Sequence, residues 1–506
     1  MLDLTFALRA YAGFRLRALA REEPVQSQRQ QLTSLLRRAA NTQFGREYGF
    51  AGIHSVEEYQ RAVPLRRYDA FWDGYWSRAY PVLDNVTWPG IIPFFANSSG
   101  TSSGVTKHIP VSAAMAKANR RAAIDLLVHH SANKPNSRVL GGKNFFLGGS
   151  AALTPVGPDV MEGDLSGIAA ARVPWWAKGF YFPTGDDAKI ADWEEKSRVL
   201  ARRALSEDIR SLSGTPSWLL LFFEEMKQAA PGSSGRLVEH WPELEMLVHG
   251  GISFEPYRAR FAELLAGSHA ETREVYPASE GFIALQDKGP RQGLRLLTDN
   301  GLFFEFVPME ELDSTEPTRH WLGTVETGVN YALVLTSCAG LWSYIIGDTV
   351  RFLEKFPPRL IVTGRTSYGL SAFGEHLIGE EIDAAIAAAA LATDIAVTDF
   401  MVGPVFAPSG PGHHLYLIEG VAVAPEKAEL FAQTIDAALC ARNVDYAEHR
   451  KGGFGMGQPQ VRFVRSGGFV AWMKARGKLG GQNKVPRVIA DADAFAATAV
   501  SLFTPP

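Results

Sequence analysis

Residues 97–107 read Asn97-Ser98-Ser99-Gly100-Thr101-Ser102-Ser103-Gly104-Val105-Thr106-Lys107, a stretch rich in glycine and hydroxyl side chains. An apolar run of strand length, residues 91–96, precedes it. Residues 107–111 after it favour an extended backbone, because Pro110 disfavours helix at the residue before it. Backbone N–H groups and hydroxyls in such a glycine-rich segment can approach an anion closely. The composition therefore predicts a phosphate-binding loop between two strands, with Lys107 adding a positive charge.

Other interpretations of this loop stay open from its residues alone. It lacks the Gly-Lys-Ser/Thr ending of a P-loop. It does match the Gly-x-Ser-x-Gly nucleophile elbow of serine hydrolases, with Ser102 as the nucleophile. That elbow needs a helix directly after the serine, whereas the next helix is expected only at about Ser112, which can act as its N-cap. The remaining alternative is an ordinary surface hairpin rich in serine and glycine.

The bulk composition narrows the class of protein. The chain has 506 residues, is 46% hydrophobic and 21% charged, and so predicts two or three globular domains. A net charge of −3 and no basic stripe argue against nucleic-acid binding. Cys338 and Cys440 are too few for a disulfide framework or a thiolate metal site, which favours a reducing, cytoplasmic location. The sequence contains no apolar run of 18 residues, so no membrane span is predicted.

Several local patterns predict individual elements. Residues 1–21 alternate apolar residues with arginines, which favours an amphipathic helix packed on the body over a membrane anchor. Residues 28–40 predict a helix with Ser27 as N-cap, and Ser55 predicts a cap for a short helix. Residues 41–50 suggest a loop with aromatic anchors. Residues 193–210 predict one charged helix. Residues 173–182, which include Trp175, Trp176, Phe180 and Phe182, suggest either a core corner or part of an apolar ligand pocket.

Two acidic residues follow strand-like runs. In residues 273–282 a strand is expected to break at Pro277, after which small residues present Glu280. Such a glutamate is either a solvated loop charge or, beside a polyphosphate, a hard-oxygen ligand for magnesium. Gly347 and Asp348 interrupt two β-rich runs. Asp348 is then either an ordinary turn residue or a carboxylate that accepts ribose hydroxyls.

The last third of the chain changes character. From about Gly364 helices and strands alternate at short spacing, which places a domain boundary near Thr363–Gly364. The predicted fold class is mixed α/β: a large N-terminal domain, residues 1–363, with β-sheets and packed helices, and a small mobile α+β domain, residues 364–506. Residues 474–487 form a glycine-rich, basic loop. It is either simply solvated or a mobile loop that brings a lysine to developing negative charge. The pairs His129-His130 and His413-His414 are interpreted as structural.

Taken together, these stretches resemble the Gretchen Hagen family of acyl acid amido synthetases, within the acyl-adenylate-forming superfamily. Residues 98–104 resemble its Ser/Thr-rich phosphate loop, and Tyr276-Pro277-Ala278-Ser279-Glu280 resembles its Tyr-x-x-Ser-Glu motif. Tyr344-Ile345-Ile346-Gly347-Asp348-Thr349-Val350-Arg351 is similar to its Tyr-Arg-Val-Gly-Asp-Val-Val motif, with Ile345 in place of arginine. Residues 482–487 echo a further motif, but Asn483 stands where the family more often has an aromatic. The motifs follow in matching order from about residue 40 to about residue 490.

The resemblance implies a role for each matching residue, with ATP and Mg²⁺ as cofactors. The phosphates would be bound at Ser98, Ser99, Gly100, Thr101, Ser102 and Ser103, with Lys107 beside them. Tyr276 and Ser279 would lie in the nucleotide site, Asp348 would bind the ribose hydroxyls, and Glu280 would hold magnesium. Lys484 would reach the reacting phosphate. Arg365 resembles the hinge-side arginine of the superfamily, although the acid that often follows it nearby is Ser367 here.

The implied activity is an ATP-dependent ligase that activates a small carboxylic acid as an acyl-adenylate and joins it to an amine, usually an amino acid. An alternative keeps the adenylation step and passes the acyl group to a thiol such as coenzyme A. Two further alternatives are a catalytically idle nucleotide-binding relative and a serine hydrolase that uses Ser102. The sequence carries no signal for the particular acid, the acceptor or the oligomeric state.

Overall fold

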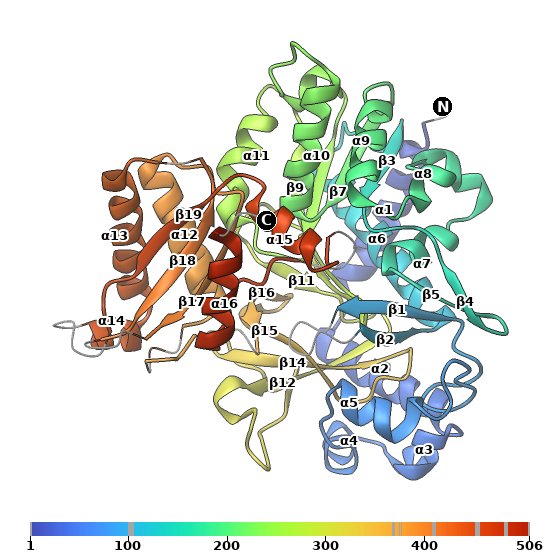
Figure 1. Cartoon of the computed structure of the whole chain (residues 1–506). Helices are drawn as coiled ribbons and strands as arrows, with labels where there is room; N and C mark the ends of the chain where they lie inside the picture. The colour runs from blue at the N-terminus through green and yellow to red at the C-terminus, as the bar shows by residue number, and fades with distance from the viewer. Residues whose placement is uncertain are drawn as a thin grey trace. The chain divides into compact units, whose positions relative to one another are not determined.

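The computed structural model describes residues 3–99, 106–366, 370–373, 375, 377–406, 411–421, 423–450, 456–479 and 484–503, apart from the side chains of Ser99 and Trp176 (Figure 1). The chain divides into two compact units. Unit 1 comprises Met1–Gly214, Val238–Gly251 and Ser268–Val362, and unit 2 comprises Thr215–Leu237, Ile252–Gly267 and Thr363–Pro506. The last segment of unit 2 thus begins at Thr363, where the sequence suggests a boundary. Two earlier segments, expected in the N-terminal domain, group with unit 2.

The main sheet has twelve strands among the described residues. In spatial order they are β13 (His320–Trp321), β12 (Leu302–Pro308), β14 (Asn330–Ser337), β15 (Tyr344–Lys355), β16 (Pro358–Arg365), β11 (Leu294–Leu296), β10 (Gly281–Leu285), β9 (Glu271–Ala278), β8 (Met246–Gly250), β7 (Ile209–Gly214), β3 (Lys143–Leu147) and β6 (Tyr181–Phe182). The five strands from β6 to β9 run parallel, and β10 turns back from β9 as an antiparallel hairpin. The sheet is therefore mixed, as expected for the predicted fold class.

A second, four-stranded sheet carries the glycine-rich segment. Its order is β2 (Thr106–Val111), β1 (Phe94–Ser99), β5 (Val160–Gly163) and β4 (Thr154–Gly157). Strands β1 and β2 pair antiparallel, from Phe94 opposite Val111 to Ser99 opposite Thr106. The prediction of two strands flanking the loop is therefore confirmed, although β1 begins at Phe94 and continues through residues 97–99, which are expected in the loop. Residues 100–105, between the two strands, lie outside the described residues.

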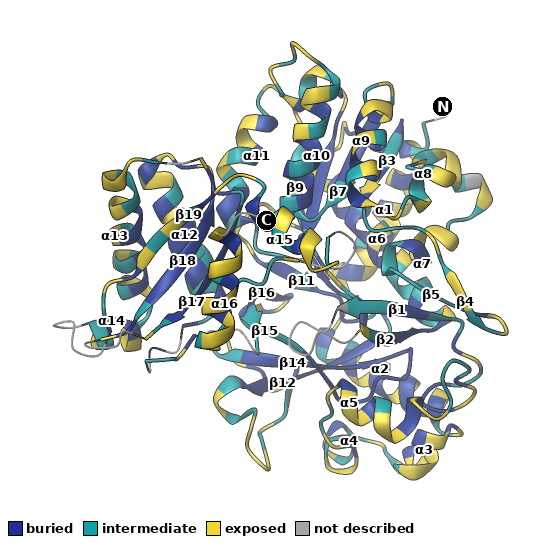
Figure 2. Cartoon of the chain, viewed as in Figure 1, coloured by how far each residue is buried: buried dark blue, intermediate teal, exposed yellow. Residues whose placement is uncertain are grey.

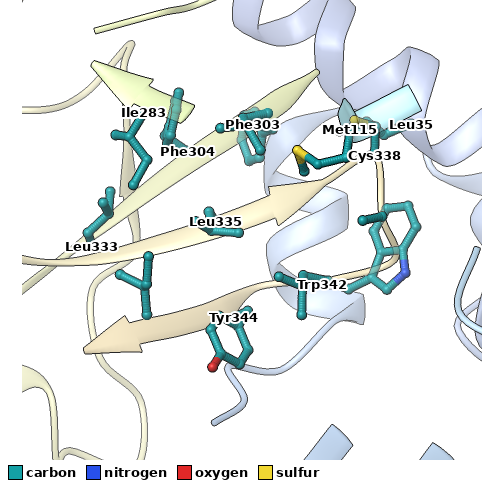
Figure 3. Packing of buried hydrophobic residues seen from close by; sticks show 14 of the residues in the cluster. Leu35, Met115, Ile283, Phe303, Phe304, Leu333, Leu335, Cys338, Trp342 and Tyr344 are labelled. Carbon is teal, nitrogen blue, oxygen red and sulfur yellow. The ribbon is translucent and has the colours of Figure 1, made fainter. Parts of the chain in front are cut away.

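The helices of unit 1 cover these sheets and fill the core between them. They are α1 (Thr5–Ala20), α2 (Pro24–Ala39), α3 (Gln43–Glu47), α4 (Val56–Ala62), α5 (Tyr68–Phe71), α6 (Ala113–Asn133), α7 (Leu165–Ala171), α8 (Asp186–Lys189) and α9 (Trp193–Ala204), with short helices at η1 (Phe50–Gly52), η2 (Trp72–Trp76), η3 (Trp175–Phe180) and η6 (Met309–Glu311). Aromatic and aliphatic side chains from the strands and helices form one large buried cluster. Figure 3 shows Phe303, Leu333 and Leu335 on its strands, with Met115 and Cys338 at one end.

The first helix packs on the body of unit 1, as predicted. Leu8 and Ala12 of α1 belong to a buried cluster with Leu126 of α6. Arg15 makes two hydrogen bonds with the carboxylate of Asp125, at 2.9 and 2.7 Å. Within the part of the chain that the structure describes, no helix is long and apolar enough to cross a bilayer.

Unit 2 is built around a three-stranded sheet, β17 (Asp399–Val405), β18 (His413–Glu419) and β19 (Gln460–Val464). Its helices are α10 (Pro216–Ala229), α11 (Arg258–Leu264), α12 (Gly379–Thr393), α13 (Pro425–Arg442), α14 (Val444–Arg450), α15 (Gly468–Ala475) and α16 (Ala492–Phe503), with the short helix η5 (Glu255–Tyr257) and with η4 (Leu237–Glu239) at the unit boundary. Alternate residues of the strands pack on opposite faces, as the period of a β-strand requires. Phe400 and Tyr416 belong to the cluster with α12 and α13, whereas Met401 and Leu417 belong to the cluster with α15 and α16. Strands β17 and β18 are accordingly buried, whereas β19 at the edge of this sheet has only Val464 buried and the outer helix faces are exposed (Figure 2).

Several sequence-based element boundaries are wrong. Helix α2 begins at Pro24 and not after Ser27, because proline is well suited to the first helical position. Residues 43–47 form a helix where a loop is expected, capped by Thr42, whose hydroxyl accepts from Gly45 N–H at 3.0 Å. The helix expected over 193–210 ends at Ala204, and the buried strand β7 follows at Ile209.

The expected break at Pro277 is also wrong. Strand β9 continues through Pro277 to Ala278, and Pro277 pairs with Phe282 on β10. The parallel pairing with β8 ends earlier, at Val275. Pro277 therefore lies beyond the part of β9 that pairs with strands on both sides, where a missing backbone N–H is tolerated.

Candidate functional site

The strand that follows the glycine-rich segment, β2, is held in place by the start of helix α6. Ser112 is the N-cap of α6, and its hydroxyl accepts the N–H of Met115 at 3.0 Å, as predicted. The same hydroxyl donates to the carbonyl of Cys338, just after β14, at 2.5 Å. Strand β2 therefore passes directly into a capped and buried helix start. Among the described residues, strand β2 and not a helix follows the segment that contains Ser102, whereas a nucleophile elbow leads directly into a helix.

The predicted phosphate-binding residues are only partly described. Ser98 and Lys107 are directly opposite each other on β1 and β2, so their side chains share one face of the small sheet. Ser99 ends β1. Gly100, Thr101, Ser102 and Ser103 lie outside the described residues. The structure thus places the two ends of the predicted loop, with the lysine at one of them.

Tyr68 holds the start of β2, although it is remote in sequence. Its hydroxyl accepts the N–H of His108 at 3.0 Å, and the Lys107 ammonium lies 5.5 Å from its ring centroid. A cation above an aromatic face is electrostatically favourable. Tyr68 is 7% exposed, and burial raises its pKa to about 12. Its hydroxyl is therefore protonated at neutral pH. Sequence reasoning missed this residue because only the fold brings it to β2.

Tyr276 and Asp348 come together, although they belong to different sequence motifs. The Tyr276 hydroxyl on β9 donates to Asp348 Oδ2 on β15 at 2.6 Å. Tyr276 is 8% exposed and Asp348 is half-buried. A carboxylate offers about four acceptor sites, so one bond from Tyr276 does not exhaust its capacity. An aromatic ring beside an oriented carboxylate is a suitable arrangement for a nucleoside.

Asp348 lies at a bulge in a continuous strand. Strand β15 pairs Ile345 with Val334 and then Thr349 with Ala332, so three residues of β15 stand opposite Leu333 alone. Gly347 has a φ of 93°, a left-handed conformation that glycine adopts without strain. Bulges redirect a side chain away from its regular position in the sheet. The interruption suggested at Gly347-Asp348 is therefore a bulge within one continuous strand, and not a turn between two strands.

Glu280 lies in the tight turn of the β9–β10 hairpin. Ser279 and Glu280 connect Ala278 and Gly281, which pair with each other, and both turn residues are 8% exposed. Gly281 has a φ of 153°, and a Cβ there would lie 3.0 Å from Leu302. It would also lie 3.4 Å from Met115, in the first turn of α6. The turn that carries Glu280 is therefore close to the start of the helix that follows the predicted phosphate loop.

A buried carboxylate at such a turn fits a magnesium ion that a nucleotide also holds. Mg²⁺ prefers hard oxygen donors and commonly binds one or two carboxylates together with substrate phosphates. Among the described residues there is no group of three or more His, Cys, Asp or Glu side chains that could hold a metal by itself. Glu280 is the residue that would hold the ion.

The other two predicted site residues belong to unit 2. Arg365 ends β16 and is half-buried. Lys484 is exposed, and it lines a small cavity of about 30 Å³ in unit 2 with Trp218, Glu419 and Phe469 among its other walls. Tyr276, Asp348 and Glu280, by contrast, belong to unit 1.

The aromatic stretch does not form a core corner as a whole. Phe182 is buried against Phe145, with ring centroids 4.8 Å apart, whereas Trp175 is 84% exposed on a short helix. Of the histidines, His130 is buried between Glu271 and Ser137, at 2.5 and 2.8 Å. His414 is likewise buried, 2.8 Å from Glu375.

A polar cluster near the loop had no signal in the sequence. The Tyr80 hydroxyl donates to Glu162 Oε2 at 2.7 Å, and His108 Nδ1 lies 3.2 Å from the same oxygen. Burial and the carboxylate of Glu162 raise the pKa of Tyr80 above its usual value. These residues come from a loop, β2 and β5, so only the pairing of the small sheet assembles them.

Solved structures of an acyl acid amido synthetase and of a CoA ligase share this fold. The structure superposes on GH3.15 acyl acid amido synthetase with a TM-score of 0.76 and 18% identity, over 94% of this chain and 93% of that chain. It also superposes on 2-hydroxyisobutyryl-CoA ligase in its postadenylation state, with a TM-score of 0.60 and 16% identity, over 94% and 91% of the two chains. At these identities the similarity shows the fold alone.

The chain belongs to the GH3 family. Residues 17–270 match the GH3 family N-terminal domain, residues 295–365 its central domain and residues 380–493 its C-terminal domain. Indole-3-acetic acid-amido synthetase GH3.3 of Arabidopsis thaliana is 25% identical over 272 residues, or 50% of this chain. That match spans 45% of the relative, so the chain covers less than half of the curated protein's length.

Proposed function

We propose that this protein is an acyl acid amido synthetase, which uses ATP to activate a carboxylic acid and transfers the acyl group to an amine, usually an amino acid. The observation that carries the proposal is the hydrogen bond from Tyr276 to Asp348. It joins two family motifs beside the turn that bears Glu280, within a fold shared with an amido synthetase.

The residue types suit a reaction between two anions. A carboxylate and ATP repel each other, so their approach requires nearby positive charge. Lys107 at the start of β2 and Lys484 in unit 2 would supply fixed cations, and Asp348 and Tyr276 would orient the nucleoside. Magnesium bound at Glu280 would neutralise negative charge on the phosphates.

The proposed reaction has two steps, adenylation and acyl transfer. The acid's carboxylate oxygen attacks the α-phosphorus of ATP, and the bond to the β-phosphate breaks with release of pyrophosphate. The amine nitrogen then attacks the acyl carbon, the bond to AMP breaks, and the amine loses a proton. Because both steps depend mainly on orientation and electrostatics, they need no nucleophilic side chain from the protein.

Pyrophosphate exchange tests the first step separately from the acceptor. Labelled pyrophosphate is incubated with protein, ATP, magnesium and a panel of indolic, aromatic and aliphatic acids, without amine. Label entering ATP in the presence of particular acids is the expected result, and the active acids name the substrate class. No exchange with any acid, together with no binding of ATP, would contradict the proposal.

A thiol acceptor is the second candidate, because the fold also matches a coenzyme A ligase. Once an acid is known, the protein is given a mixture of amino acids or coenzyme A, and products are identified by mass. Amide products with amino acids support the first candidate. Thioester products alone would favour the second.

A further inference from the structure

Arg487 lies three residues after Lys484 and makes more polar contacts than its place in a basic loop suggests. Its guanidinium donates to the Tyr257 hydroxyl at 2.5 Å and to the carbonyl of Phe400 at 3.1 Å. It also forms an ion pair with Asp399. The side chains of Arg487 and Asp399 are 11% and 12% exposed, so the pair is largely removed from water.

The backbone around Arg487 is held by the same strand. The carbonyl of Arg487 accepts the N–H of Val402 at 2.9 Å, and Ile489 N–H donates to the carbonyl of Val402 at 3.0 Å. Asp399, the ion-pair partner, also belongs to β17. The segment is therefore attached to β17 both through its backbone and through its one buried charge.

The two residues between Lys484 and Arg487 restrict the backbone that connects them. Pro486 restricts its own φ, and Val485 packs against the apolar cluster on one face of the unit 2 sheet. Lys484 itself lines the same small cavity as Asp399 and Val485. The path of the chain at Lys484 is thus determined on its C-terminal side by Arg487 and its neighbours.

We propose that Arg487 is a positioning residue, which anchors the backbone at Lys484 to β17 so that the lysine can reach the reacting phosphate. The inference rests on the proposed function, because it assigns Lys484 a part in adenylation. A lysine carries a point charge on a flexible stem, so its reach depends on where its backbone is held. A misplacement of about 1 Å in a catalytic group can cost about 100-fold in rate.

The central experiment replaces Arg487 with lysine, alone and together with Lys484→Ala. Lysine keeps the charge but cannot form the fork of bonds to Tyr257, Asp399 and Phe400. Arg487→Lys is expected to slow single-turnover adenylate formation 10- to 100-fold, with less than twofold change in the dissociation constant for ATP. In the Lys484→Ala background the same substitution is expected to slow it less than twofold, because Arg487 acts through Lys484. Equal slowing in both backgrounds, or an equal loss of ATP affinity, would overturn the proposal.

Two controls separate positioning from general destabilisation. Arg442→Lys changes an exposed arginine at the end of α13, in the same unit and outside residues 474–487, and is expected to leave the rate unchanged. Tyr257→Phe removes one hydrogen bond and keeps the ring, and is expected to slow adenylation less than Arg487→Lys does. If Arg487→Lys fails to fold, Tyr257→Phe still tests whether the anchor affects adenylation. A rate for Tyr257→Phe equal to that of the unchanged protein would count against the anchor.

Hydrogen exchange tests the anchor without any activity. The amide of Ile489 is expected to exchange at least tenfold faster in Arg487→Lys than in the unchanged protein. Unchanged exchange overturns the proposal whatever the enzyme does. Faster exchange in a protein that adenylates no acid would support the anchor and locate the failure in the proposed function.

Discussion

At the scale of single residues, the hydroxyl of Tyr276 joins two motifs that the sequence separates. Tyr276→Phe removes the donor to Asp348 and keeps the ring. The bond, which contributes about 1.5–3 kcal/mol, orients the carboxylate that would accept the ribose hydroxyls, so its loss is expected to raise the dissociation constant for ATP by up to about tenfold. Calorimetric titration with ATP measures this dissociation constant.

The matched control is Tyr331→Phe. Tyr331 lies on β14 of the same sheet, and its hydroxyl accepts the N–H of Glu326 and makes no bond to Asp348. ATP affinity should be unchanged in this variant. If both variants bound ATP equally well, Tyr276 would have no special part in orienting Asp348.

Glu280 is the residue on which the magnesium proposal depends. Glu280→Gln keeps the shape of the side chain but replaces the carboxylate with an amide, a poorer ligand for a hard cation. Pyrophosphate exchange at fixed magnesium is expected to fall about 100-fold, with half-saturation at higher magnesium. Glu310→Gln, at an exposed position of unit 1, controls for loss of one negative charge. An unchanged magnesium titration in Glu280→Gln would remove Glu280 from the site.

His129 predicts a pH dependence of stability. It is 6% exposed on α6, and burial lowers its pKa from 6.5 to about 4. Between these pH values the unfolded chain binds the proton and the folded chain does not, so the free energy of unfolding falls as the pH falls. The drop from 6.5 to about 4 corresponds to about 3 kcal/mol.

Urea denaturation of the unchanged protein and of His129→Gln at pH 7 and pH 4.5 checks this expectation. Other groups titrate in both proteins, so the difference between their pH dependences isolates His129. The variant should lose less stability on acidification. An identical loss in the two proteins would show that His129 titrates normally in the folded state.

At the scale of elements, Ser112 links strand β2, helix α6 and the end of β14. Ser112→Ala removes an N-cap and leaves the buried Cys338 carbonyl without this donor. The loss in the free energy of unfolding is expected to be about 1–3 kcal/mol. Thermal unfolding measures it, and Ser112→Thr, which keeps a hydroxyl, should lose clearly less. Equal losses in both variants would point to side-chain size and not to the cap.

At the scale of the whole molecule, the proposed nucleotide-binding residues and Lys484 belong to different units. ATP binding and chemistry should therefore be separable by mutation. Lys484→Ala is expected to leave the dissociation constant for ATP within about twofold and to slow single-turnover adenylation about 100-fold. Binding and rapid-quench measurements on one preparation check both quantities. An equal loss in ATP affinity and rate would mean that Lys484 contributes to ground-state binding.

The sequence by itself determined that two strands flank the glycine-rich segment, that Ser112 caps a helix, that the β pattern is irregular at Gly347-Asp348, and the family. These features depend on neighbours in the chain: proline and glycine restrict or free the backbone, and a serine caps the helix that it precedes. The tertiary structure alone decided which distant residues meet. It placed Tyr276 against Asp348, Tyr68 beneath Lys107 and Arg487 on β17.

The helices and strands that were wrongly predicted from the sequence also depend on contacts between distant residues. The helix pattern after Trp193 and the aromatic run near Trp175 satisfy local rules equally well in more than one state. Packing selects among these states: strand β7 forms where it can pair with β3 on one side and β8 on the other. Local patterns therefore specify caps, turns and motifs, whereas long-range pairing and burial determine how those motifs are assembled into a site.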